Sequence, residues 1–179
     1  MTTAESIFIV ATISALLVGA ILVKKIDWAG LGFKPKSIFA GWLQVLLFNG
    51  ILFLLVQLTI ATNLVHFPDW ITDKDPLLPL LIIGFLQEVV FRGLLIHWLK
   101  RWGEKRALWG STAIFVLFHV VAPYTWSGVG ILFASLTLIA GYFWGRHFLK
   151  HRNIYLLGLS HFLLNLSFNY VIFSTIVLK

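Results

Sequence analysis

Residues 76–99 read PLLPLLIIGFLQEVVFRGLLIHWL, an apolar run that Glu88 and Arg92 interrupt near its middle. About 20 apolar residues span the ~30 Å hydrocarbon core of a bilayer, so this run predicts a membrane-spanning helix. An ionisable side chain there costs roughly 2.5 to 3.5 kcal/mol on insertion scales and is usually retained for function. Glu88 is the one acidic residue in any apolar run of the chain. Chemistry that needs a carboxylate inside the membrane therefore has to use Glu88.

The composition is that of an integral membrane protein. Of the 179 residues, 59% are hydrophobic and 12% are charged, and the mean hydropathy is +0.92. Soluble domains carry about twice that share of charged residues. Apolar runs that qualify as membrane helices cover residues 6–23, 38–62, 76–99, 107–122, 128–147 and 154–178. We therefore expect an all-α, polytopic membrane protein with about six transmembrane helices, forming a single domain over residues 1–179.

The basic residues alternate with the expected helices, and this explains the net charge of +7 without a nucleic-acid partner. Eleven of the 14 follow the first, third and fifth runs: Lys24, Lys25, Lys34, Lys36, Lys100, Arg101, Lys105, Arg106, Arg146, Lys150 and Arg152. By the positive-inside rule these connections are cytoplasmic. The pattern predicts a multi-pass protein of the cell membrane, with the lipid bilayer as its partner and both termini outside.

Three of the expected helices bring polar side chains to one depth. At 1.5 Å per residue, Glu88 lies about 18 Å into the third helix and His119 roughly 20 Å into the fourth. His161 and Asn165 lie about 12 and 18 Å into the sixth. Glu88 and Arg92 are four residues apart and share a helix face, as do His161 and Asn165. We expect these side chains to line one polar cavity, with Glu88 and Arg92 in direct contact.

The same residues fall into three short motifs: QEVVFR at 87–92, FVLFH at 115–119 and HFLLN at 161–165. They resemble the Glu-Glu-x-x-x-Arg, Phe-x-x-x-His and His-x-x-x-Asn motifs of the CAAX prenyl protease and bacteriocin-processing family, CPBP or ABI. Any one of the motifs arises easily by chance in a chain with 16 Phe and 6 His. All three, in order and at matching depth, are specific. The resemblance covers about residues 80–169.

The resemblance implies a CAAX-protease-like helical bundle and an intramembrane endopeptidase. Its substrate would be a peptide or the tail of a membrane-associated protein, prenylated or not. In the family the first glutamate, assisted by the histidine at position 119, activates water. The residues at 161 and 165 then stabilise the oxyanion, while those at 88 and 92 support the site. The candidate catalytic residues are Gln87, Glu88, Arg92, His119, His161 and Asn165.

Gln87 departs from the family pattern, because it stands where the catalytic glutamate is expected. An amide can orient a water molecule but cannot accept its proton. Three interpretations stay open. Glu88 takes over as the base; or the protein is an inactive member that acts by binding, in bacteriocin immunity or as a membrane scaffold; or Gln87 is an engineered replacement of a glutamate.

No cofactor is expected. Glu88, His119 and His161 are acceptable ligands for a divalent metal such as zinc, and the family is often labelled metallopeptidase. No helix, however, offers the paired-ligand spacing of a zinc motif. Simpler structural interpretations are an ion pair between Glu88 and Arg92 that braces the bundle, and histidines that form hydrogen bonds between helices.

Overall fold

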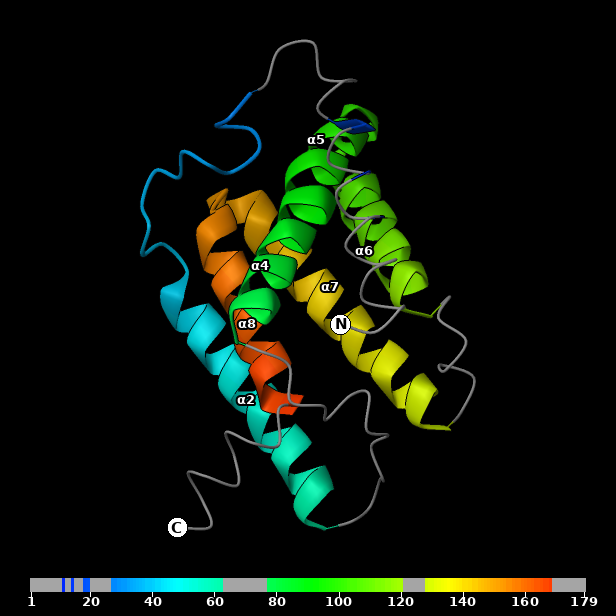
Figure 1. Ribbon diagram of the computed structural model, residues 1–179. Helices are drawn as coiled ribbons and strands as arrows, with labels where there is room; N and C mark the ends of the chain where they lie inside the picture. The colour runs from blue at the N-terminus through cyan, green and yellow to red at the C-terminus, as the bar shows by residue number, and fades with distance from the viewer. Residues whose placement is uncertain are drawn as a thin grey trace.

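The computed structural model of the chain describes residues 27–62, 77–120 and 128–168, together with four positions near the N-terminus, Ala11, Ser14, Val18 and Gly19. All regular structure in this part is helical, as expected (Figure 1). The elements are α2 (Trp42–Ala61), α4 (Leu77–Glu88), the π-helix η1 (Val89–Leu95), α5 (Ile96–Leu99), the 3-10 helix η2 (Lys100–Trp102), α6 (Glu104–Val120), α7 (Gly128–His151) and α8 (Ile154–Phe168).

The four elements from α4 to η2 follow one another without a break, so residues 77–102 form one long helix. Its stretch Leu80–Trp102, 23 residues, is long and apolar enough to cross a membrane. Within the described ranges it alone meets that test, and α2 and α8 supply the shorter apolar stretches Trp42–Leu58 and Ile154–Ser167. Six spans are therefore not confirmed. Most of the expected run 6–23, and the end of 154–178, lie outside the described residues.

Helix α8 lies against both α4 and α2, and α6 packs along α7 (Figure 1). Glycines permit both contacts. A Cβ atom on Gly158 of α8 would lie 2.5 Å from Cδ2 and 3.2 Å from the backbone Cα of Phe85 in α4. A Cβ on Gly145 of α7 would lie 2.6 Å from Cδ1 of Leu108 in α6. These close approaches bring the helices that carry the polar motifs together.

We expect Gly158→Val to destabilise the fold by about 1 to 3 kcal/mol, the usual cost of overpacking a core. The new side chain would meet the backbone of Phe85, which cannot rotate away as a side chain can. Thermal unfolding in detergent would measure the change. Gly50→Val is the matched control, because no described atom lies within 4 Å of a Cβ at that position in α2. Equal shifts for both variants would contradict the close α4–α8 contact.

The basic connections gather at one end of the bundle. Arg152, between α7 and α8, donates a hydrogen bond of 3.1 Å from Nη1 to the carbonyl of Gly30, and Asn153 donates one of 2.7 Å to the carbonyl of Ile38. A Cβ on Gly30 would also lie 2.8 Å from Nδ1 of His97 in α5. The first, third and fifth connections therefore share an end, as the charge pattern predicted. Which side of a membrane that end faces stays a prediction.

Candidate active site

Glu88, the last residue of α4, is the centre of a buried polar cluster. Its side chain is fully buried, as is that of Arg92. Its Oε1 accepts a hydrogen bond of 3.0 Å from Nη1 of Arg92 and lies 2.8 Å from Nδ1 of His161. The expected contact between Glu88 and Arg92 is confirmed. One carboxylate oxygen thus links the long central helix to α8.

Arg92 lies in the π-helix η1, which begins directly after Glu88. A π-helix is wider than an α-helix, and short π segments inside α-helices are frequent at functional sites. Gly93 in this segment faces the 27–40 connection, where a Cβ would lie 3.2 Å from the carbonyl oxygen of Leu31. The widened turn therefore fits closely against that connection because residue 93 has no side chain.

The buried guanidinium of Arg92 has partners on several sides. Besides Glu88, its Nη2 donates a hydrogen bond of 3.3 Å to the carbonyl of Gly141 in α7. Its Cζ lies 4.2 Å from the ring centroid of Phe115 and 5.2 Å from that of Trp144, within the range of cation–π attraction. The charge is therefore matched by a carboxylate, a carbonyl dipole and two aromatic faces.

The ring of Phe115 contacts both motif histidines, His119 and His161. The ring centroid of Phe115 lies 4.3 Å from that of His119 and 6.0 Å from that of His161. Nδ1 of His119 lies 2.7 Å from the carbonyl oxygen of Phe115. His161 is buried and stacks on Trp144 at 4.5 Å with 22° between the ring planes. Three helices thus place their polar groups in one neighbourhood; their depth in a membrane stays a prediction.

Gln87 is also buried, with 3% of its surface exposed. Its Oε1, like Oε2 of Glu88 and Nε of Arg92, has no hydrogen-bond partner in the described part of the chain. Buried polar atoms are nearly always paired, so each of these two acceptors is suited to a donor such as water or a peptide N–H. Asn165 lies one turn from His161, is partly exposed, and makes no hydrogen bond to the other candidates described here.

The sequence model of one protein family, described as type II CAAX prenyl endopeptidase Rce1-like, matches residues 75–167, which is more than half of the chain. The chain belongs to this family. The matched range contains all six candidate residues and confirms the relationship that the three motifs indicated. No curated protein and no solved structure matches the chain. The Rce1-like family is a family of membrane proteases, so at family level the chain is placed among hydrolases.

A second layer of this Rce1-like site was not predicted from the sequence. Nε1 of Trp144, the ring that stacks on His161, donates a hydrogen bond of 2.8 Å to Oγ of Ser160. The same oxygen accepts a hydrogen bond of 2.6 Å from Nδ2 of Asn49. Asn49 belongs to α2, outside the range that the family matches. The one available signal was an isolated amide within an apolar run, which identifies no partner.

We expect Ser160→Ala to destabilise the protein by about 1 to 3 kcal/mol, because Trp144 Nε1 would lose its buried acceptor. Tryptophan fluorescence during denaturant unfolding would measure the loss. Ser167→Ala is the matched control on the same helix, because Oγ of Ser167 donates to the carbonyl of Leu163 within α8 itself. Although Ser167 is buried, its loss should cost only about 0.5 kcal/mol, because a serine hydroxyl bonded to the i−4 carbonyl adds little to a helix. A smaller loss for Ser160→Ala than for the control would refute the supporting role.

The expectation that the site needs no metal ion or other cofactor stays a prediction. Over the described ranges, no group of three or more His, Asp or Glu side chains converges as a set of ligands. Nδ1 of His161 is directed at Glu88, and Nδ1 of His119 at the carbonyl of Phe115, so both nitrogens face protein atoms.

Proposed function

We propose that this protein is an intramembrane endopeptidase that hydrolyses a peptide bond in the tail of a membrane-associated protein, with prenylated tails as the preferred substrates. Glu88 carries the proposal. Its carboxylate is fully buried, with Oε1 held by Arg92 and His161 and Oε2 without a described partner. Membership of a family described as CAAX prenyl endopeptidases supports the substrate class.

In the proposed reaction, Oε2 of Glu88 acts as the general base. The water oxygen bonds to the scissile carbonyl carbon while one water proton passes to Oε2, and the carbonyl electron pair becomes the oxyanion. When the C–N bond breaks, the oxyanion collapses to a carboxyl group and the proton passes from Glu88 to the leaving amine. Asn165 is a proposed oxyanion donor, and so is Nε2 of His161 when the ring carries both protons, since Nδ1 already donates to Glu88. His119 assists the attacking water. Gln87 orients a hydrogen-bond donor but takes no proton.

The fixed position of Glu88 suits this role. General-base catalysis requires the acceptor within about 2.6 to 3.2 Å of the proton donor. Arg92 and His161 both hold Oε1, so the carboxylate cannot rotate freely and Oε2 keeps one direction.

The proposed location is the cell membrane, with the basic end of the bundle in the cytoplasm.

The amide at position 87 favours a second function. Without the family's first glutamate, the protein could bind a membrane protein or peptide without cleaving it, and Glu88 would then serve the fold alone. The two functions make opposite demands. A binding function survives Glu88→Gln if the fold does, whereas cleavage does not.

Purified protein in lipid vesicles would be offered two peptides of identical sequence that end in Cys-aliphatic-aliphatic-X, one farnesylated and one unmodified. Mass spectrometry would identify the products. The proposal expects cleavage, faster for the farnesylated peptide. If both peptides are cleaved equally fast, prenylation is not part of the specificity. If neither the parent nor Gln87→Glu cleaves either peptide, the peptidase function is overturned in favour of binding.

A further inference from the structure

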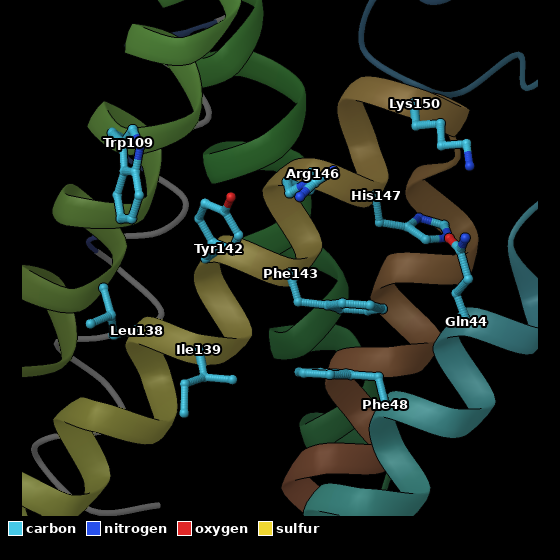
Figure 2. Close-up of a pocket in the computed structure, with 10 residues that line it drawn as sticks. All are labelled: Gln44, Phe48, Trp109, Leu138, Ile139, Tyr142, Phe143, Arg146, His147 and Lys150. Carbon is cyan, nitrogen blue, oxygen red and sulfur yellow. The ribbon is translucent and has the colours of Figure 1, made fainter.

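A groove on the outer face of α7, bordered by α2 and α6, contains none of the candidate catalytic residues (Figure 2). Its volume is about 580 Å³. A second cavity of about 460 Å³ adjoins it at the basic end of the bundle and shares Trp109, Tyr142, Arg146 and Lys150 with it. The two form one continuous surface along α7. The proposed hydrolysis does not use it.

One end of this groove is apolar. Phe48 of α2 and Phe143 of α7 stack face to face, with ring centroids 3.8 Å apart and 9° between the planes, and form a flat wall (Figure 2). Leu138 and Ile139 lie about one turn before Phe143 in α7 and are 45% and 51% exposed. From Leu138 to Lys150 the helix rises by about 18 Å. That is close to one leaflet of a bilayer, since the whole hydrocarbon core measures ~30 Å.

The other end is basic. Arg146 and Lys150 line both cavities, and Lys105 of α6 lines the second. Glu104 is the one acidic residue along either described cavity. Its carboxylate lies 2.7 Å from Nζ of Lys100, and this hydrogen bond lowers the pKa of Glu104. The charge of Glu104 is therefore matched by Lys100, and the end of the groove keeps a positive excess.

Aromatic side chains lie between the two ends. The rings of Trp109 and Tyr142 are 4.9 Å apart and come from facing helices, α6 and α7. Tryptophan and tyrosine are enriched where the hydrocarbon core meets the headgroups. The order along α7 is thus apolar, then aromatic, then basic, which is the order of an acyl chain, a glycerol backbone and an anionic headgroup.

We propose that this groove binds one anionic phospholipid, with the phosphate on Arg146 and Lys150 and an acyl chain along Phe143 and Ile139. Basic pockets between membrane helices on the cytoplasmic side are known to select anionic headgroups. Charge complementarity favours a phospholipid over an uncharged lipid, and the apolar wall favours it over free phosphate. The proposal does not depend on the proposed hydrolysis.

The full chain in detergent would be mixed with phosphatidylglycerol and phosphatidylcholine of identical acyl chains in equimolar amounts, and native mass spectrometry would count the lipids retained. Each Lys or Arg near an anionic headgroup contributes about fivefold in affinity. The double variant Arg146→Gln/Lys150→Gln should therefore lose phosphatidylglycerol retention by about 25-fold. Lys34→Gln/Lys36→Gln is the matched control, since both lysines are exposed at the same end but do not line the groove. The control should retain the lipid.

Ile139→Trp tests the apolar end without changing the charge, and it should also weaken retention. Equal losses in the two double variants would overturn the site in favour of a general surface charge effect. Displacement of the lipid by inorganic phosphate at the same concentration would mean a phosphate site instead. A dimer that only the groove variants dissociate would assign the groove to a second copy of the chain. Equal retention of both lipids by the parent would also refute the proposal.

Discussion

Gln87→Glu should raise the rate of peptide cleavage by about 10² to 10⁴, the usual contribution of a general base, if the first glutamate of the family mechanism takes over this role from Glu88. The two side chains are nearly isosteric, and Gln87 is already buried with an unpaired Oε1. The substitution supplies the glutamate that the family motif has at this position, next to the carboxylate of Glu88. The measurement is kcat/KM for a membrane-tethered peptide with the protein in vesicles.

Two further variants interpret that result. Ser37→Glu adds the same charge at an exposed position of the 27–40 connection, away from the groove, and should leave the rate unchanged. Glu88→Gln in the parent should abolish cleavage, because it removes the proposed base. If Gln87→Glu is no faster while Glu88→Gln is inactive, Glu88 is the working base by itself. If Glu88→Gln cleaves as fast as the parent, the proposed mechanism is wrong.

Arg92→Met should destabilise the protein by about 3 to 5 kcal/mol, the typical effect of removing one partner of a buried ion pair. The substitution leaves Glu88 fully buried without its guanidinium partner. It also removes the hydrogen bond to Gly141 and the cation–π contact with Phe115. Denaturant titration in detergent, with the same lipid content for every variant, would measure the free energy of unfolding.

The double variant Glu88→Gln/Arg92→Met should recover most of this loss, because replacing a whole buried pair by uncharged residues is often neutral. Arg101→Met is the matched control. Its guanidinium stacks over Trp98 and Trp102, with Cζ 4.7 and 4.2 Å from the ring centroids, on residues that are exposed. It should cost about 1 kcal/mol or less. A loss for Arg92→Met no larger than for Arg101→Met would show that the buried pair is not strongly coupled.

Much of the candidate site was predictable because helical geometry is regular. The spacing of Glu88 and Arg92 places both on one face wherever the segment is helical. Two opposite charges buried on one face are expected to pair, because an unpaired buried charge is costly. Helical rise placed His119 and His161 at a similar depth. Phe115 contacts both rings, which agrees with that estimate. Local helix geometry predicted which residues lie near one another. It did not predict which of them form hydrogen bonds or stack.

The contacts of His161 show where prediction from sequence stopped. Its spacing to Asn165 indicated a shared face, yet Nδ1 is directed at Glu88, 73 positions away, and the ring stacks on Trp144. The π-helix after Glu88 was also missed, because residues 76–99 were treated as a regular α-helix. The widened turn lies where Gly93 closely approaches Leu31, a residue 62 positions away, and no pattern within residues 76–99 specifies that approach.

The sequence by itself determined the helical fold class, the residues that could carry chemistry, and the family, because apolar run length and motif spacing are local properties of the chain. Only the tertiary structure decided that one oxygen of Glu88 binds both Arg92 and His161 while the other has no described partner. Only the structure shows that Asn49 of α2 donates a hydrogen bond to Ser160 beside the site, and that a groove runs along α7. The physical reason is that helix packing sets these contacts. They join residues that are far apart in the chain and depend on how each helix is rotated against its neighbours, which no local pattern specifies.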